Sequence, residues 1–398
     1  MPGPKALTDR SVADLWKEVK NPERWWDDLQ DELTRTIKDL LENALEGELL
    51  EQLHARWYQR NPDRVDQRNG FYMRSLQTRL GVIQDLRVPR SRNGIYQSEL
   101  LPRYQRAEAS VDQLVKDAFL AGVSTRRVGE VLKPVLGTAT SPATVSQIAK
   151  HLDADVAAFH KRALTDDIVY LFLDGVYAKV KGTDRAHRKP LLVAYGITTT
   201  GERRLISYRL GFSESEPEWE AFLNDLYKRG LEGKNLRLIV TDGGSGLHAA
   251  LQTVYPYVPR QRCWVHKMRN VRSKLPARQR DACVQQLRTV YLAATQEAAR
   301  ERYKIWVQRW EETAPKAVEC VRKDIDELLS FLKEPAAVWR SVRTTNAIER
   351  LFREVRRRVR PMTCFNNNDS CERITYSVFS YQNTKWEGRP LQHFTQNT

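Results

Sequence analysis

IVYLFLDGVYAKV, residues 168–180, is the stretch that decides the fold, an apolar and β-branched run with one acid, Asp174, in its middle. Its composition and length predict a strand buried in a sheet. An ionised carboxylate is costly to bury unless a partner charge or a metal ion compensates it. The stretch therefore predicts both a central strand and a functional acid.

The segments that follow predict a sheet of defined order. They comprise strands at 189–198 and 204–210, a helix at 216–229 and a fourth strand at 236–244. The fourth strand ends on Asp242 and two glycines, a position at which α/β sheets place functional groups. The order β-β-β-α-β is that of the RNase H fold, in which the first and fourth strands are neighbours. Asp174 and Asp242 are therefore expected to meet.

A third acid lies far along the chain, in the stretch TTNAIERLFREVRRRVRP at 344–361. On a helix, Ile348, Phe352 and Val355 form one apolar stripe. The opposite side carries Asn346, Glu349, Arg350, Arg353, Arg357 and Arg360. An isolated glutamate in such surroundings most simply forms surface salt bridges, so Glu349 becomes a candidate only together with the other two acids.

Three carboxylates on a basic protein match what two-metal phosphoryl transfer requires. Two Mg²⁺ or Mn²⁺ ions about 4 Å apart use carboxylate ligands, one ion activating the attacking oxygen and the other stabilising the leaving oxygen. We therefore expect Asp174, Asp242 and Glu349 to be both catalytic residues and metal ligands.

Composition indicates the partner. The 398 residues include 65 Lys and Arg against 50 Asp and Glu, which gives a net charge of +15 and a pI near 9.6. This balance favours double-stranded DNA over an anionic membrane surface. No apolar run approaches the roughly 20 residues of a transmembrane helix, so we expect no membrane and a cytoplasmic, nucleoid-associated protein. The five cysteines form no C-x-x-C pair, which argues against a disulfide framework or a zinc ribbon.

Residues 22–58 predict an acidic amphipathic helix. Its apolar stripe consists of Leu29, Leu33, Ile37, Leu40, Leu41, Ala44 and Leu45. An acidic helix repels DNA, so we expect the stripe to pack against another helix. That helix could be the same segment of a second subunit, which would make a homodimer, and packing within the chain is the alternative.

Residues 69–100 predict short strands or a β-hairpin. Basic residues at Arg68, Arg74, Arg79, Arg87, Arg90 and Arg92 alternate there with the aromatic Phe71, Tyr72 and Tyr96. This composition is typical of a surface that contacts phosphates. A hairpin that is merely charged and solvated is the alternative.

Residues 111–153 predict three helices, the last of which begins in SPATVSQIAK at 141–150. Val145 and Ile148 would face inward. The exposed side would carry Thr144, Gln147 and Lys150, as the recognition helix of a helix-turn-helix carries residues to base edges in the major groove. An ordinary helical bundle has the same pattern, so both interpretations stay open.

Four short blocks act together as a more specific signal than any one of them. They are LDGVYAK at 173–179, VTDGG at 240–244, RCWVHK at 262–267 and TTNAIER at 344–350. In this order they resemble the Mutator-like bacterial insertion-sequence transposases. The resemblance implies a DDE transposase that recognises terminal inverted repeats, cleaves DNA without a covalent enzyme intermediate and joins the freed 3′-hydroxyl to target DNA. It also implies that Asp174, Asp242 and Glu349 are the triad.

The long interval between Asp242 and Glu349 leaves room for an inserted unit. Residues 276–338 predict helices throughout, and a small core could be filled by Trp306, Trp310, Val318, Leu328, Leu329, Phe331 and Leu332. This agrees with the all-helical insertion that the resemblance implies. The insertion would contact transposon-end DNA or serve as a scaffold.

Cys263 and His266 match a C-x-x-H element characteristic of the family. Two ligands without a second pair nearby do not make a structural zinc site, so we expect no zinc. We expect Cys263 and His266 to help position DNA. Further DNA contacts are expected from Arg262, Lys267, Arg269, Asn346, Arg350, Arg353 and Arg357.

These expectations define a multidomain α+β protein. It would have an RNase H-like α/β catalytic core with an all-helical insertion, preceded by helical and helix-turn-helix DNA-binding domains. The segments are 1–60 (helical, dimerisation), 61–105 (hairpin-like, DNA-contacting), 106–160 (helix-turn-helix), 161–275 (first part of the core), 276–338 (insertion) and 339–398 (last part of the core). The alternatives are a structure-specific nuclease that cuts without joining and a DNA-binding regulator whose carboxylates are structural.

Overall fold

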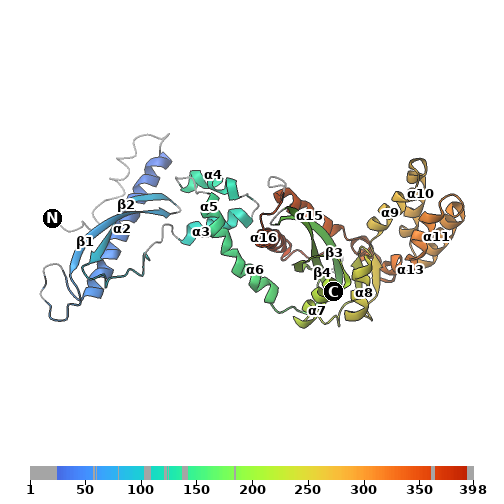
Figure 1. Cartoon of the computed structure of the whole chain (residues 1–398), viewed down its shortest axis with the longest axis horizontal. Coiled ribbons are helices and arrows are strands. Elements are labelled where there is room, and N and C mark those ends of the chain that lie inside the picture. The colour runs from blue at the N-terminus through green and yellow to red at the C-terminus, as the bar shows by residue number, and fades with distance from the viewer. Residues whose placement is uncertain are drawn as a thin grey trace. The chain divides into compact units, whose positions relative to one another are not determined.

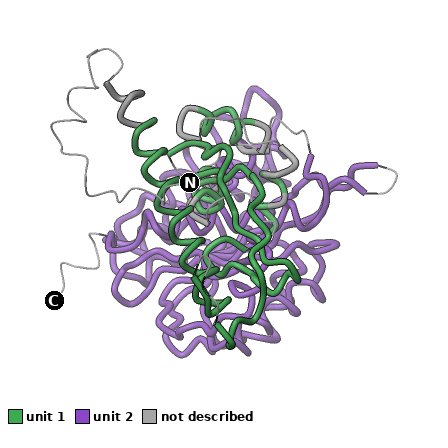
Figure 2. The backbone as a smooth tube through the Cα atoms, turned by 90° about the vertical axis from the view of Figure 1, so that its left-hand side faces the viewer, with its two compact units in different colours: residues 1–119, 123–150 green, residues 120–122, 151–398 purple. Residues whose placement is uncertain are grey.

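The chain forms two compact units in a computed structural model. The structure describes residues 25–56, 59, 61–78, 80–102, 109–120, 123, 125–136, 142–182, 185–359 and 364–391. One unit contains 1–119 and 123–150, and the other contains 120–122 and 151–398 (Figure 2). Each unit combines helices with one β-sheet (Figure 1), so the expected α+β class is confirmed. None of the described helices is long and apolar enough to cross a membrane.

In the first unit, a long helix packs against a hairpin (Figure 1). The helix is α2 (Trp25–Leu53), and the antiparallel strands are β1 (Arg68–Thr78) and β2 (Gly81–Ser91). Their joint core contains Leu45, Leu76, Ile83, Leu86, Val88 and Leu101, with Ile37 and Leu41 packed against it. These residues of the stripe thus pack within the chain, which is one of the two alternatives, and their partner is the hairpin, because a two-stranded sheet needs a cover for its apolar face. Leu33 and Leu40 are exposed, so they are available for a contact with a second subunit.

The hairpin expected at 69–100 is confirmed, and its basic residues divide into two groups. Arg87 is exposed and lies 5.2 Å from the centre of the exposed Phe71 ring. Arg68 is only 10% exposed and is bonded to Glu46 of α2, so a phosphate contact would require this pair to break. Arg79 lies outside the described residues.

Three helices complete the first unit, as expected. They are α3 (Ala109–Leu120), α4 (Thr125–Leu136) and α5 (Pro142–Lys150). Val145 and Ile148 of α5 face the core with Val111, Val115, Val128 and Leu132. Lys150 is exposed, whereas the side chains of Thr144 and Gln147 lie outside the part of the chain that the structure describes.

The second unit is built on a five-stranded mixed sheet. Its strands are β3 (Ile168–Lys181), β4 (Ala186–Thr198), β5 (Arg203–Leu210), β6 (Leu238–Thr241) and β7 (Arg260–Arg262). They are ordered β5-β4-β3-β6-β7, antiparallel from β5 to β3 and parallel from β3 to β7. The expectation that the first and fourth of these strands are neighbours is confirmed by the pairing of β3 with β6.

Helices cover both faces of this sheet. On one face lie α7 (Glu216–Lys228) and α8 (Ser245–Val254), whose Phe222 and Leu251 share a core with Leu171 and Leu173 of β3. Against the other face pack α15 (Asn346–Val359) and α16 (Asn368–Trp386), with α6 (Leu152–Lys161) next to α16. Successive side chains of a strand point to opposite faces, so Asp174 points to the side of α15 and α16.

The residues between β7 and α15 form helices, as expected. After α9 (Trp264–Ser273) come α10 (Ala277–Tyr291), α11 (Gln296–Trp310), α12 (Pro315–Arg322), α13 (Ile325–Leu328), the 3-10 helices η2 (Ser330–Lys333) and η3 (Ala336–Val338), and α14 (Trp339–Val342). Of the expected core residues, all are buried except Leu332, which is half-buried. Gln261 of β7 fastens this helical segment to the sheet, since its fully buried amide donates to the Leu328 carbonyl (3.0 Å) and accepts from the Phe331 N–H (2.7 Å).

Candidate active site

Two of the three acids follow paired residues of adjacent strands. Leu173 of β3 pairs with Thr241, the last residue of β6, so Asp174 is the next residue within β3 and Asp242 is the first residue after β6. The chain turns sharply after Asp242, with Gly243 at a φ of +89°, and the Gly244 N–H donates to the Asp242 carboxylate (3.1 Å). The expected meeting of Asp174 and Asp242 is thus produced by strand pairing.

The third acid reaches the same place from the first turn of α15. The apolar residues Ile348, Phe352 and Val355 are buried, so the helix packs on the sheet as its stripe predicts. This orientation brings Glu349 into range of Asp174. Burial, together with the negative charges of Asp242 and Glu349, raises the pKa of Asp174 to about 7, although His266 and Thr345 oppose the increase.

Glu349 is held by two cationic side chains of α9. Arg269 donates to both carboxylate oxygens, over 2.7 and 3.3 Å, and His266 Nε2 lies 3.5 Å from Oε1. In the described part of the chain, no three His, Cys, Asp or Glu side chains are close enough to hold a metal ion as they stand. The side chain of Glu349 is thus directed toward Arg269 in this conformation.

A buried hydroxyl joins the C-x-x-H element to the acids. Cys263 immediately precedes α9, and its sulfur accepts from the backbone N–H of Thr345 (3.3 Å) and from the Thr345 hydroxyl (3.5 Å). The same hydroxyl lies 3.5 Å from His266 Nδ1. Thr345 is fully buried and also hydrogen-bonds Asp174. Sequence reasoning missed the role of Thr345, because nothing in the TTNAIER stretch shows what a threonine faces.

Cys263 and His266 behave as a coupled polar pair. The hydrogen bond with Cys263 raises the pKa of His266 to about 9, although burial opposes this, and the nearby acids support it. Burial would raise the pKa of the Cys263 thiol, but the hydrogen bonds with His266 and Thr345 outweigh it and lower that pKa. The pair is therefore placed to carry a proton and a charge beside Asp174.

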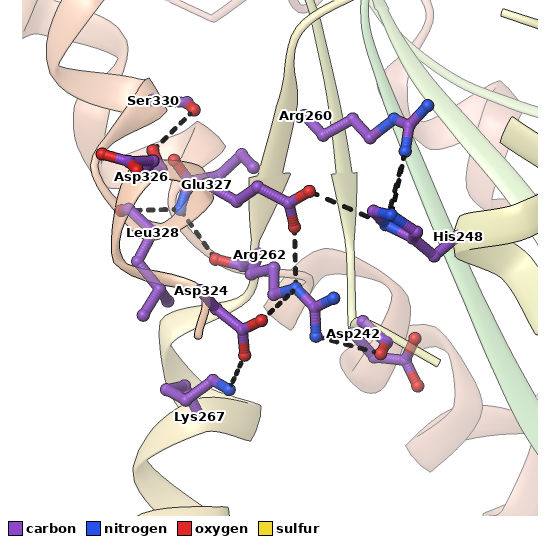
Figure 3. Close-up of polar contacts among 12 residues, drawn as sticks. Asp242, His248, Arg260, Arg262, Lys267, Asp324, Asp326, Glu327, Leu328 and Ser330 are labelled. Carbon is purple, nitrogen blue, oxygen red and sulfur yellow. Dashed lines mark hydrogen bonds and ion pairs between the residues drawn. The ribbon is translucent and has the colours of Figure 1, made fainter. Parts of the chain in front are cut away.

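Two predicted DNA contacts, Arg262 and Lys267, are engaged inside the protein (Figure 3). The Arg262 guanidinium contacts Glu327 (2.7 Å) and Asp324 (3.3 Å), and donates to the Gly243 carbonyl (3.1 Å). Lys267 is 6% exposed, is paired with Asp324 and donates to the Cys320 carbonyl (3.1 Å). A phosphate contact by either would require these bonds to break.

Figure 3 shows Arg262 between the helical segment and the turn that carries Asp242. Gly243 has a φ of +89°, which favours glycine, and a side chain there would displace the Arg262 guanidinium. Glu327 and Asp324 orient Arg262, and Arg262 holds the turn. The helical segment therefore supports the position of Asp242.

The remaining predicted residues lie on or beside α15. Asn346 and Arg350 line a pocket of about 580 Å³ with Arg203, Arg340 and Arg343. Arg353 and Arg357 are exposed on the next turns, where Arg357 is paired with Glu354 (2.7 Å). The face of α15 that carries Glu349 is thus strongly basic.

A fourth acid, Glu214, lies beside the cluster and was not predicted. Its carboxylate covers Gly175, where a side chain would collide with it. Burial raises the pKa of Glu214, and the charge of Asp242 contributes. Its surroundings in the sequence, GFSESEPE at 211–218, are those of a polar loop, so no periodicity distinguishes it from its neighbours.

A mixed sheet that gathers acids at its centre beneath a basic helix defines a candidate enzyme of nucleic-acid chemistry. The family model described as "Transposase, Mutator family" matches residues 10–388. The chain therefore belongs to the Mutator family of transposases, which confirms the resemblance of its four sequence blocks.

Individual relatives agree with this assignment. The chain is 35% identical, over 89% of each protein, to the transposase for insertion sequence element ISRM5 of Rhizobium meliloti. It is 33% identical, over 83% of each, to the transposase for insertion sequence element IS905 of Lactococcus lactis. It is also 30% identical to the transposase for insertion sequence element IS256 in transposon Tn4001 of Staphylococcus aureus, over 90% of this chain and 92% of the relative.

Proposed function

We propose that the protein binds the terminal inverted repeats of an insertion sequence, cleaves the ends and joins the 3′-hydroxyl to target DNA. The observation that carries this proposal is the convergence of Asp174, Asp242 and Glu349 from three separate elements. The strand order β5-β4-β3-β6-β7 supports an RNase H-like assignment for the sheet. Membership in the Mutator family supports transposition as the overall reaction.

The donor set fits a hard divalent cation, Mg²⁺ or Mn²⁺. Asp174 is 4% exposed, and its raised pKa reflects burial and two acidic neighbours. A divalent ion would compensate this charge, and carboxylate oxygens are its preferred ligands. Asp174, Asp242 and Glu349 would hold two such ions, which supply an activated attacking oxygen and a stabilised leaving oxygen. We assign no zinc to Cys263 and His266.

For Glu349 to act as a ligand, it would have to exchange Arg269 for the metal. An exposed ion pair contributes at most about 1 kcal/mol, so this exchange costs little. Arg269, with 59% of its side chain exposed, would then be available for a phosphate. In this proposal Asp174 and Asp242 are adjacent before DNA arrives, and Glu349 joins them once it is released from Arg269. Cys263, His266 and Thr345 supply the polar surroundings of Asp174.

DNA would be contacted mainly through exposed cations. Arg350, Arg353 and Arg357 present charge on the α15 face next to Glu349, and phosphate contacts of this kind position DNA without reading its sequence. We assign α5 as the recognition helix of a helix-turn-helix, with Lys150 exposed, and the hairpin as a second contact. The segments 1–60, 61–105, 106–160, 161–275, 276–338 and 339–398 remain our proposed domains.

A homodimer would allow two transposon ends to be held together. The exposed Leu33 and Leu40 of α2 are its proposed seam. Light scattering of a Leu33→Lys, Leu40→Lys double variant tests this, since charges on the seam would release monomers. If the interface lies elsewhere, the double variant should remain a dimer in light scattering.

The decisive experiment combines end binding with cleavage and strand joining. Asp174→Asn, Asp242→Asn and Glu349→Gln should each abolish cleavage and joining while end binding stays within about twofold, because each removes a metal ligand and not a DNA contact. Asp326→Asn is the matched control, since Asp326 is an exposed acid paired with Arg300. Cleavage without joining by the wild type would favour the nuclease alternative, and binding without cleavage at any metal concentration would favour the regulator.

A further inference from the structure

A pocket of about 530 Å³ lies next to the acids, between β3 and α15. Its interior is apolar and is formed by Val176, Ala178, Leu191, Phe352, Val355 and Phe365. This volume is in the range of sites that bind small organic groups. Phe365 is held at the pocket by backbone hydrogen bonds to β3. Its N–H donates to the Lys179 carbonyl and its carbonyl accepts from the Lys181 N–H, each over 2.8 Å.

The pocket continues from two of the acids on both of its walls. On β3, Asp174, Val176 and Ala178 alternate to the same face, and two residues advance a strand by about 6.6 Å. On α15, Arg353 lies four residues after Glu349 and therefore on the same side of the helix, and Phe352 of the buried stripe lines the pocket beside Arg353. A strand of DNA with one phosphate at the acids would therefore have its neighbouring nucleotide beside this pocket.

Cations surround the opening of the pocket. Lys179, Arg353 and Arg356 line it and are exposed. Within the described residues, no carboxylate is paired with any of these three. An apolar interior with a basic rim is complementary to a nucleotide, whose base is flat and apolar on its faces and whose phosphate is anionic. Half-exposed Tyr177, with Arg188 4.9 Å from its ring centre, adds an aromatic surface at the same edge.

We propose that this pocket binds one base that is turned out of the DNA duplex next to the cleavage position. This inference rests on the proposed function, since the DNA must be an end that the enzyme cleaves. Turning out a base costs a few kcal/mol of stacking and pairing. Burial of the base against Val176, Ala178 and Phe352, and phosphate contacts with Arg353 and Arg356, would offset this cost. The device would fix the position of the cut relative to the transposon end.

The test uses duplexes of an end found by footprinting, with 2-aminopurine placed at successive positions around the cut. In the presence of Ca²⁺, the wild type should raise the fluorescence at one position about threefold or more, because the base leaves the stack. A mismatch at that position should tighten binding about tenfold, because the unpairing cost is already removed.

Ala178→Trp fills the pocket and should remove both effects while end binding by the remaining contacts stays measurable. Val176→Phe is a second, smaller filling variant in case the tryptophan does not fold. Ala157→Trp is the matched control, because Ala157 is an exposed alanine on α6. It should behave as the wild type in the fluorescence and mismatch assays.

Three outcomes would overturn the inference. The first is that the wild type cleaves the duplex but raises the fluorescence at no position. This result would leave the proposed function intact. An increase that survives both filling variants would place the base elsewhere. A change of oligomeric state in Ala178→Trp that leaves the fluorescence increase as in the wild type would assign the pocket to a second copy of the chain. Absence of end cleavage by the wild type would instead contradict the proposed function itself.

Discussion

Arg269 of α9 donates to the carboxylate of Glu349 through both terminal nitrogens of its guanidinium, over 2.7 and 3.3 Å. The two residues are far apart in the sequence and meet because α9 begins directly after β7, while α15 packs against β3 of the same sheet. If Glu349 is a metal ligand, as we propose, Arg269 would compete with the ion for its carboxylate, and the ion pair would be the resting arrangement of the site.

Arg269→Gln should lower the Mn²⁺ concentration for half-saturation about two- to fivefold in calorimetric titrations without DNA. The reason is that an exposed ion pair stabilises the resting arrangement by up to about 1 kcal/mol. Arg272→Gln is the control, since Arg272 lies on the same helix and makes a similar exposed pair with Asp281 (2.8 Å). An equal decrease of the half-saturating Mn²⁺ concentration in both variants, or no decrease in Arg269→Gln, would show that Arg269 does not compete with the metal for Glu349.

Asp324→Asn should destabilise the second unit by about 3 kcal/mol or more in denaturant unfolding. It leaves the buried ammonium of Lys267 without its countercharge, and breaking a buried pair has this cost. Asp326→Asn, two residues away, breaks an exposed pair with Arg300 and should cost less than about 1 kcal/mol. Similar stability of the two variants would show that Lys267 does not depend on Asp324.

Replacing Arg353 and Arg357 by Gln should weaken binding to all DNA sequences alike. The salt dependence of the binding constant should fall by about 0.9 in logarithmic slope for each phosphate that is no longer neutralised. Arg353 should contribute more than Arg357, because Arg357 is already paired with Glu354. Arg309→Gln on the helical segment is the control, and a slope unchanged in the double variant would direct this face of α15 away from DNA.

Changes at Thr144, Gln147 or Lys150 to Ala should lower discrimination between the inverted repeat and random DNA by about tenfold each. Base-edge contacts carry sequence information and are worth about 1–3 kcal/mol. Competition binding with both DNAs measures the ratio. If all three variants keep it, another segment reads the end, and the hairpin of β1 and β2 is the next candidate.

Cys263→Ser and His266→Ala should lower cleavage or joining while leaving the zinc content of the purified protein unchanged. Cys263 and His266 are joined to Thr345 and to the acids, and a closed structural zinc site requires four ligands. Mass spectrometry of the metal content measures this directly. Stoichiometric zinc that is lost in the double variant would show that the pair is a metal site. Zinc binding would in that case also stabilise the fold.

The sequence alone determined the strands, the stripe of α15, the helical segment between β7 and α15, and the identity of the three candidate acids. Each depends on local properties. Period-two or period-3.6 burial predicts a strand or a helix, and an acid inside an apolar run, as Asp174 is, requires compensation wherever the chain folds. The order of the elements then indicated that β3 and β6 are neighbours.

Only the tertiary structure decided which side chains face the acids. It turned Lys267 and Arg262 toward Asp324 and Glu327, placed Thr345 between Cys263 and Asp174, and brought Arg269 to Glu349. It also packed the apolar stripe of α2 on the hairpin and so identified the partner of the stripe within the chain. Charged side chains have the same local pattern whether they meet water, DNA or an opposite charge. Their partners come from distant segments, and contacts of that kind exist only once the chain has folded.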